Sequence, residues 1–232
     1  MPTSKKILEE LEQLIDESLP SVATIDWDTV GVKFEGDTVV GLGLHHCGLM
    51  ALPEDFGQLY SLKELYLGDN ELTALPESFS ALSSLTLLNL CVNELRTLPE
   101  SILYLKALQI LILAANQLTI LPESLEDLRS LQTLGLSSNQ LTALPETFGN
   151  LKSLNWLHLS SNRLTLLPET FGNLKSLSWL NLESNRLTTL SGSFFQLSNL
   201  KWLYIQNNPL DTKGKKIVDQ LRKNAKGVKI KT

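Results

Sequence analysis

The segment LKELYLGDNELTALPESFSALSS, from Leu62 to Ser84, decides the fold, because its pattern recurs along most of the chain. Each copy reads L-x-x-L-x-L-x-x-N-x-L-x-x-L-P-x-x-F-x-x-L-x-x, and Cys47 takes the asparagine position of the first copy. A fixed period of this kind predicts a stacked repeat architecture of eight units. The asparagines recur every 23 residues, at Asn70, Asn93, Asn116, Asn139, Asn162, Asn185 and Asn208.

The residues of each unit explain why the units stack. Each L-x-L forms a short strand whose leucines face inward while the residues between them face outward. No unit buries its apolar face alone, so neighbours stack into a solenoid with a parallel sheet on one side. The asparagine follows the strand, where its amide satisfies backbone groups of the turn, and a column of such amides crosslinks successive units. The proline step keeps a regular helix from starting there.

Two neighbouring copies are nearly identical, LPETFGNLKSLNWLHLSSNRLT from Leu144 and LPETFGNLKSLSWLNLESNRLT from Leu167. These motifs resemble the leucine-rich repeat family, in its 23-residue intracellular-type form with a Leu-Pro step, over about Val39–Leu210. The resemblance implies an α/β right-handed solenoid, a horseshoe, with a parallel concave β-sheet. It also implies short turns or 3-10 segments on the convex side and helical caps at both ends.

The ends of the chain depart from the period, as the caps of a solenoid must. We expect an N-terminal cap over residues 1–38, eight repeats over 39–210 and a C-terminal capping helix over 211–232, forming one structural domain. In the first cap, apolar residues at helical spacing predict a helix over Ser4–Ser18, followed by a short hairpin. The segment from Trp27 resembles the opening of many leucine-rich repeat domains, in which a tryptophan covers the first repeat. At the other end we expect a helix over Lys213–Ala225 and a last extended piece with Val228 and Ile230.

Composition narrows the class of protein. The 232 residues are 43% hydrophobic with a net charge of −5, and the sequence holds two cysteines and no Asn-x-Ser/Thr acceptor. These features predict a cytoplasmic protein without a disulfide framework, a signal peptide, a transmembrane segment or a nucleic-acid partner.

The two ends of the chain differ in charge. Residues 1–37 carry nine acidic and three basic residues, and residues 209–232 carry two acidic and eight basic ones. Solvated cap faces explain this asymmetry, and an acidic partner for the basic end or head-to-tail association stays an alternative.

The repeat register assigns the outward residues of the predicted sheet. Trp156, Trp179 and Trp202 fall on one column of consecutive repeats, and we expect them to pack against each other. Aromatic anchors beside small polar residues are typical of binding hot spots, although such a column also stabilises a sheet by itself. The predicted partner-binding residues are Trp156, Trp179, Trp202, Tyr204 and His158, with Tyr66, Ile110 and Ile112 as a second contact group.

Convergent catalytic groups are not predicted. His45 and His158 lie five repeats apart, about 24 Å by the strand spacing. His45 and His46 point to different sides of an extended segment, and no histidine neighbours Cys91 on the adjacent repeats, so neither a metal site nor a Cys/His nucleophile is expected. Phosphate-loop and dinucleotide motifs are missing. We therefore expect no catalytic residue, no cofactor and no metal.

These observations predict a non-catalytic module that binds a protein or peptide on its concave sheet, as a signalling or scaffold adaptor. Some proteins that it resembles are associated with small GTPases, but no motif here identifies such a partner. Two other uses of the surface stay open. One is a carbohydrate or small-ligand site with the tryptophans as a stacking platform, and the other is a structural, self-associating unit. A monomer is the expected state.

Overall fold

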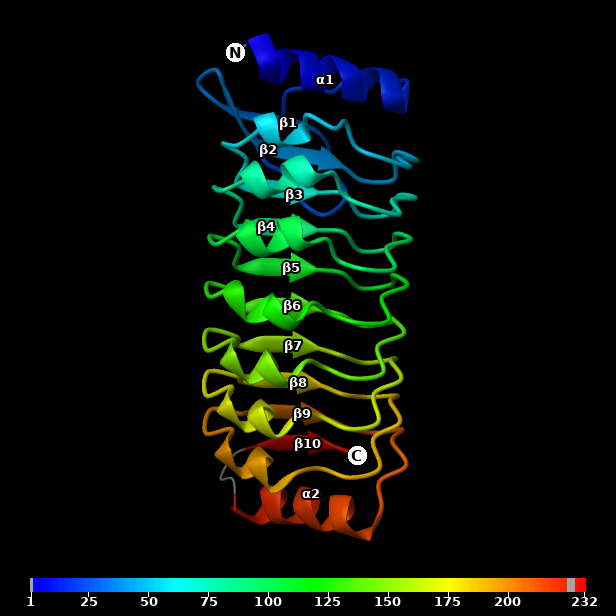
Figure 1. Ribbon diagram of the computed structural model, residues 1–232, viewed down its shortest axis with the longest axis vertical. Helices are drawn as coiled ribbons and strands as arrows, with labels where there is room; N and C mark the ends of the chain where they lie inside the picture. The colour runs from blue at the N-terminus through cyan, green and yellow to red at the C-terminus, as the bar shows by residue number, and fades with distance from the viewer. Residues whose placement is uncertain (1, 225–227) are drawn as a thin grey trace. The chain divides into compact units, whose positions relative to one another are not determined.

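The computed structural model describes residues 2–224 and 228–232, so Ala225, the last residue of the predicted C-terminal helix, lies outside it. The chain divides into two compact units, one ending at Gln117 and the other beginning at Leu118. In both units each repeat contributes one short strand and one 3-10 segment, as Figure 1 shows. The fold is therefore that of leucine-rich repeats, as predicted from the recurring motif.

The N-terminal unit begins with a helix and a hairpin and continues with three repeat strands. Strands β1 and β2 are antiparallel, and β2, β3, β4 and β5 follow in parallel register. Its elements are α1 (Pro2–Ile15), β1 (Val30–Glu35), β2 (Thr38–Leu44), η1 (Phe56–Gln58), β3 (Glu64–Tyr66), η2 (Glu77–Ala81), β4 (Leu87–Asn89), η3 (Glu100–Tyr104) and β5 (Ile110–Ile112).

The C-terminal unit repeats this plan and ends in a helix and one more strand. Strands β6, β7, β8, β9 and β10 pair in parallel, with β10 at the edge beside β9. Its elements are η4 (Glu123–Asp127), β6 (Thr133–Gly135), η5 (Glu146–Asn150), β7 (Trp156–His158), η6 (Glu169–Asn173), β8 (Trp179–Asn181), η7 (Gly192–Gln196), β9 (Trp202–Tyr204), α2 (Thr212–Asn224) and β10 (Lys229–Lys231).

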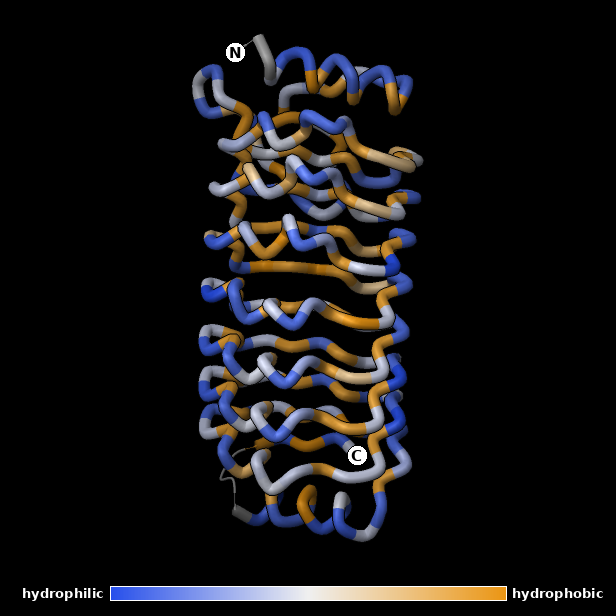
Figure 2. The backbone as a smooth tube through the Cα atoms, viewed as in Figure 1, coloured by the Kyte–Doolittle hydropathy of each residue, from blue (hydrophilic) through white to orange (hydrophobic). Residues whose placement is uncertain are grey.

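The leucine core lies between the sheet and the 3-10 segments of each unit. The central leucine of every repeat strand is buried, for example Leu65 and Leu180. Figure 2 shows the strands as hydrophobic stretches of the chain and the turns beyond them as hydrophilic ones. On the 3-10 side the phenylalanines stack, with ring centroids 5.6 Å apart for Phe56 and Phe79 and 6.2 Å apart for Phe148 and Phe171. Stacked aromatic pairs of this kind stabilise a core beyond the area that they bury.

The repeated asparagines form a hydrogen-bonded ladder beside this core. Asn162 is typical: its Oδ1 accepts from the backbone N–H of Leu141 at 3.0 Å, and its Nδ2 donates to the carbonyl of Leu136 at 2.8 Å. Both partners belong to the preceding repeat. Its Nδ2 also lies within hydrogen-bond distance of two carbonyls of its own turn, those of Leu159 and Ser160. Each such side chain therefore satisfies backbone groups that the turn would otherwise bury without partners.

The first repeat shows what is lost without the asparagine. Cys47 Sγ donates to the carbonyl of His45 at 3.4 Å. Of the contacts that a ladder asparagine makes, this reproduces only the one to the carbonyl two residues earlier in the chain. The next ladder residue, Asn70, compensates by accepting from the backbone N–H groups of both Cys47 and Leu49. A weaker donor is tolerated at this position because no earlier repeat has to be linked.

The N-terminal cap covers the first repeat differently from the expectation for Trp27. Trp27 is 64% exposed, and its ring meets that of His45 in a T-shaped arrangement with centroids 5.8 Å apart. Strand β1 pairs with β2 and carries the buried Val32, and Ile25 is also buried there. The prediction that a tryptophan covers the first repeat was wrong, because the β1 hairpin already occupies that edge.

Candidate functional site

The sheet face turned away from the leucine core carries the predicted binding residues, and we call it the outer sheet face. In the C-terminal unit the register pairs Trp156 with Trp179 and Trp179 with Trp202. His158 and Tyr204 stand two residues further along their strands, on the same face. We define the aromatic stripe as Trp156, His158, Trp179, Trp202 and Tyr204.

The rings of the stripe touch in an order that the register alone does not give. Trp156 stacks on Trp179 with centroids 5.7 Å apart and planes 10° from parallel. Trp179 then meets Tyr204 at 5.2 Å, and Tyr204 meets Trp202 at 6.4 Å. The Tyr204 ring thus contacts both Trp179 and Trp202. The expected packing of neighbouring tryptophans is seen for Trp156 and Trp179, and near Trp202 the Tyr204 ring adds contacts that the register did not predict.

Trp156 is the most open member of the stripe, with 47% of its surface exposed, whereas the other four members are half-buried. Next to it in register lies Thr133 of β6, and Gly135 lies beside His158. These small residues leave the stripe accessible from the β6 side. A ligand that meets the stripe therefore finds one exposed indole and a row of half-buried rings behind it.

His158 contributes a neutral ring to the stripe. Its centroid is 3.9 Å from that of Trp179, with planes 28° apart. Burial lowers the pKa of the His158 imidazole below its usual value, because the buried site disfavours the charged form. At neutral pH the ring therefore contributes apolar contact area and one donor or acceptor rather than a charge.

Two lysines that the repeat pattern does not reveal complete the far end of the stripe. Strand β10 places Lys229 opposite Trp202 and Lys231 opposite Tyr204. The ammonium of Lys229 lies 4.3 Å from the centroid of the Trp202 ring, and that of Lys231 lies 5.1 Å from the Tyr204 ring. Both distances are within the range of cation–π attraction. The alternating Val-Lys-Ile-Lys sequence indicates a strand, but its register against Trp202 is not visible in the repeat pattern.

The second predicted contact group lies in the N-terminal unit and is less continuous. Ile110 is paired with Leu87, and both are half-buried, so these residues share an apolar patch with Ile112. Tyr66 is separated from Ile112 by Asn89, whose side chain is buried and accepts from the backbone N–H of Cys91. Burial raises the pKa of the Tyr66 phenol, with Glu64 and Asp26 adding to the effect. Tyr66 therefore does not join the two isoleucines in one patch.

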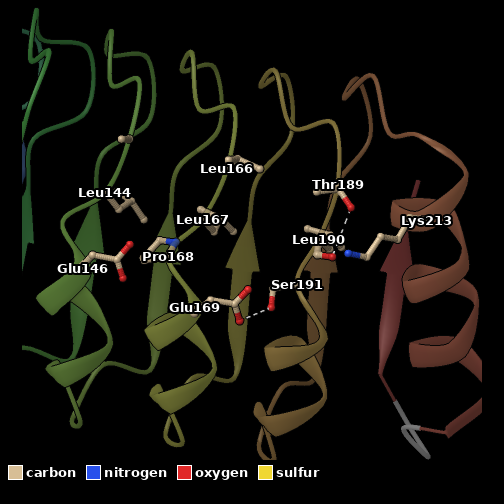
Figure 3. A pocket seen from close by; sticks show the side chains of 11 residues that line it. Leu144, Glu146, Leu166, Leu167, Pro168, Glu169, Thr189, Leu190, Ser191 and Lys213 are labelled. Atoms are coloured by element: carbon tan, nitrogen blue, oxygen red, sulfur yellow. Dashed lines mark hydrogen bonds between the residues drawn. The ribbon is translucent and has the colours of Figure 1, made fainter.

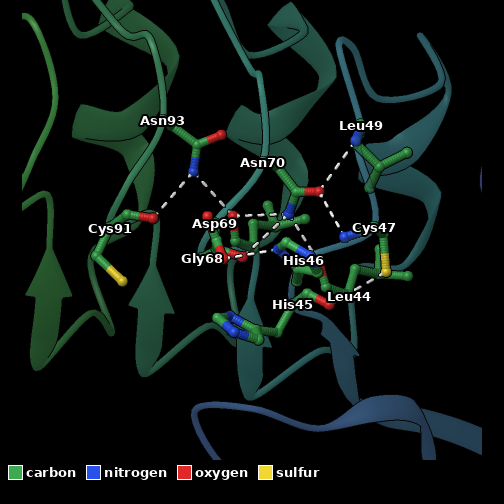
Figure 4. A network of polar contacts seen from close by, with 11 residues as sticks. Leu44, His45, His46, Cys47, Leu49, Gly68, Asp69, Asn70, Cys91 and Asn93 are labelled. Carbon is green, nitrogen blue, oxygen red and sulfur yellow. Dashed lines mark hydrogen bonds and ion pairs between the residues drawn. The ribbon is translucent and has the colours of Figure 1, made fainter.

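Figure 4 shows the polar cluster around the first three repeats, in which Asn70 and Asn93 hydrogen-bond to neighbouring backbone groups. A Cβ atom on Gly68 would lie 3.0 Å from Cys91 Sγ and 3.4 Å from His45 Nδ1. The space that a side chain at Gly68 would fill therefore lies between the Cys91 thiol and the His45 imidazole. His46 is separate, since its Nδ1 lies 2.7 Å from Asp69 Oδ2.

This cluster does not have the properties of a nucleophilic site. Burial raises the pKa of the Cys91 thiol, and burial likewise raises the pKa of Cys47. A thiol with a raised pKa stays protonated at neutral pH and reacts slowly. Among the residues that the structure describes, no group of three histidine, cysteine or acidic side chains is arranged to hold a metal ion.

A shallow recess of about 350 Å³ lies on the opposite side of the C-terminal unit (Figure 3). It is lined by segments between the ladder and the 3-10 helices, with Leu166 exposed and Glu146 and Glu169 at its border. Glu169 accepts a hydrogen bond of 2.5 Å from the Ser191 hydroxyl, so this carboxylate already has a partner. The recess lacks the aromatic residues that distinguish the outer sheet face.

Comparison with known proteins agrees with this geometry. The family model described as "Leucine rich repeat" matches residues 38–95, 83–141, 119–164, 143–187 and 165–210, which together span most of the chain. The chain belongs to the leucine-rich repeat family. The leucine-rich repeat fold is a generic module for protein–protein interaction, and proteins of this family are typically non-enzymatic. The comparison with curated proteins gives no match.

Solved leucine-rich repeat structures resemble the chain over most of its length. A leucine-rich repeat protein of Leptospira interrogans is 39% identical, with a TM-score of 0.78 over 83% of this chain and 48% of that one. An internalin of Listeria monocytogenes shares the fold at 21% identity, with a TM-score of 0.70 over 78% of this chain and 52% of that one. A plant peptide hormone receptor in complex with RGF2 is 29% identical, with a TM-score of 0.62 over 68% of this chain and 26% of that one. The chain thus spans about half, or less, of these proteins.

The described residues contain no helix that is both long and apolar enough to cross a membrane.

Proposed function

We propose that this leucine-rich repeat chain is a non-catalytic interaction module that binds a protein or peptide partner through the aromatic stripe. The observation that carries the proposal is the continuous set of ring contacts from the exposed indole of Trp156 through Trp179 to Tyr204, whose rings are half-buried. Binding hot spots are enriched in tryptophan and tyrosine, which give large contact areas at a small entropic cost.

The stripe is prepared for binding before a partner arrives. Short strands with buried central leucines, such as Leu157 and Leu180, hold the backbone beneath it. Contacts with His158 and Tyr204 restrict the Trp179 ring, so little side-chain freedom remains to be lost on binding. The apolar patch of Leu87, Ile110 and Ile112 is a second surface of the proposed module, on the N-terminal unit.

Two free cysteines support an intracellular setting for the proposed adaptor, since the fold uses no disulfide between them. The exposed face of Trp156 also suits stacking against a sugar ring. That alternative requires polar groups around the indoles, and Asn181 already uses its Oδ1 to accept from the backbone N–H of Glu183. The third use is self-association, in which the aromatic stripe of one copy of the chain would bind the stripe of another copy.

Affinity capture with matched variants tests the proposal. A chain with Trp156→Ala and Trp179→Ala is expected to lose the proteins that the unaltered chain captures. The control is Phe195→Ala, which removes a 45% exposed aromatic ring from η7, on the other side of the solenoid. Circular dichroism establishes that each variant is folded. Capture that survives the double substitution in a folded chain, or that Phe195→Ala removes equally, contradicts the proposal. Sedimentation over a range of concentrations identifies self-association instead.

A further inference from the structure

The aromatic stripe is apolar at Trp156 and cationic at its other end. Strand β10 closes the edge of the C-terminal unit beside β9, and its two lysines lie over Trp202 and Tyr204. Ile230, between them, is half-buried, so the strand is anchored by one side chain and directs the other two to the outer sheet face. A third lysine, Lys201, precedes β9, and its carbonyl accepts the backbone N–H of Lys229.

Among the residues that the structure describes, these three ammonium groups have no carboxylate partner. Across residues 2–224 and 228–232, no ion pair within 4.0 Å involves Lys201, Lys229 or Lys231. Each ammonium carries three donors, and an aromatic ring that lies against one side leaves the others directed to solvent. In the sequence, residues 209–232 carry eight basic and two acidic residues, so this end of the chain has a net positive charge.

We infer that the partner segment recognised by the aromatic stripe is an acidic peptide, with a large apolar residue against Trp156 and Trp179 and carboxylates at Lys229 and Lys231. This inference rests on the proposed function and specifies the chemistry of its partner. Charge complementarity selects the occupant: a basic segment would bring like charges onto the lysine end, and a neutral one would leave the ammonium groups without partners.

The spacing of the two ends sets the spacing of the peptide residues. From Trp156 on β7 to β10 there are three strand intervals of about 4.8 Å, or about 14 Å. An extended peptide advances about 3.3 Å per residue, so the acidic residues lie about four residues from the apolar anchor. Because Lys229 and Lys231 are two residues apart on one strand, a pair of carboxylates fits the site better than one.

The experiment selects a displayed library of random peptides, about twelve residues long so that each spans the stripe, against the full chain. Selected peptides that lose binding to the Trp156→Ala, Trp179→Ala chain are sequenced. We expect them to combine a large apolar residue with aspartate or glutamate about four residues away. Synthetic copies are then titrated against the chain at low and high salt, together with scrambled copies of the same composition.

Lysine variants locate the charged contact. Lys229→Gln with Lys231→Gln is expected to weaken the selected peptides by about tenfold, as the loss of two exposed ion pairs implies, and to reduce the salt dependence. Lys229→Arg with Lys231→Arg keeps the charge and the contact with the rings, and is expected to restore most of the affinity. The control, Lys216→Gln, removes an exposed charge from α2 and is expected to leave the affinity unchanged.

The outcomes separate the two claims. Tryptophan-dependent peptides that lack acidic residues, or that bind the Lys229→Gln, Lys231→Gln chain equally well, overturn the acidic-peptide inference and leave the proposed function standing. A selection without any tryptophan-dependent peptide overturns both. Dimerisation of the chain at rising concentration, abolished by the same lysine variant, shows that a second copy with its acidic N-terminal segment occupies the site, and also overturns the inference.

Discussion

Replacing Asn162 by aspartate isolates what the ladder amide contributes, because the side chain keeps its shape and loses only its donors. The amide nitrogen lies 2.8 Å from the carbonyl of Leu136 and 3.2 and 3.3 Å from those of Leu159 and Ser160. An ionised carboxylate would direct a charged oxygen at all three. Asn162 is 7% exposed, so water does not relieve this contact.

The size of the effect follows from proton uptake. The new carboxyl avoids the repulsion by binding a proton, which also restores a donor to Leu136. Holding a carboxyl with an ordinary pKa of about 3.9 protonated at pH 7 costs about 4 kcal/mol, and at pH 5 about 1.5 kcal/mol. The pKa of the introduced carboxyl is therefore raised in the folded state, and the folded state binds more protons than the unfolded one. The stability of the variant consequently falls as the pH rises from about 4 towards the folded pKa.

Urea denaturation followed by circular dichroism at pH 7 and pH 5 measures this difference against the unaltered chain at the same pH. The control is Asn173→Asp, the same substitution at a half-buried residue of η6 for which the described structure gives no side-chain hydrogen bond, and it is expected to cost less than about 0.5 kcal/mol. A loss below about 1 kcal/mol at pH 7 for Asn162→Asp, or an equal loss at both pH values, would refute the role assigned to the ladder.

Other predictions concern close packing, backbone strain and the buried imidazole. Gly149→Ala would place a Cβ 2.0 Å from the Thr170 carbonyl oxygen, so we expect the free energy of unfolding to fall by about 2–3 kcal/mol. The control, Gly192→Ala, adds a Cβ with nothing within 4 Å and should leave the stability unchanged. Thermal melts of both variants measure the difference. Val92 is 47% exposed and has a φ of +53°, a left-handed conformation that strains a β-branched residue more than an asparagine. Val92→Asn should therefore raise the free energy of unfolding by about 1 kcal/mol. An unchanged or lower urea midpoint would show that no strain is released. Burial lowers the pKa of His158, so protonation favours the unfolded chain and stability should decline as the pH falls below about 6.5. His158→Gln should remove that part of the decline, which paired melts at pH 7.5 and 5.5 would measure.

The repeat could be predicted from the sequence because one physical requirement dominates the choice of residue at each of its main positions. A leucine between two outward residues has to be buried, and an asparagine such as Asn139 after the strand meets a turn with unsatisfied backbone groups. The period then assigns every strand residue to a face. This is why Trp156 and Trp179 were correctly placed side by side.

Features that depend on rings and end segments were not readable in this way. The contacts of the Tyr204 ring with both Trp179 and Trp202 depend on side-chain rotations that a register does not specify. The place of Lys229 depends on where the chain returns after α2, and nothing in the period fixes that return. Trp27 is exposed since the pairing of β1 with β2, not the indole, closes the first repeat.

Site-specific photo-crosslinking tests the central claim, that partners meet the aromatic stripe, most directly. A photoreactive phenylalanine derivative is placed at position 156, the most exposed residue of the stripe, or at position 195, an exposed aromatic position on η7. After irradiation with cell extract, we predict partner adducts from position 156 that unlabelled chain competes away and that the Trp179→Ala substitution reduces. Adducts that form equally well from position 195, or only from there, would contradict the assignment of the binding surface.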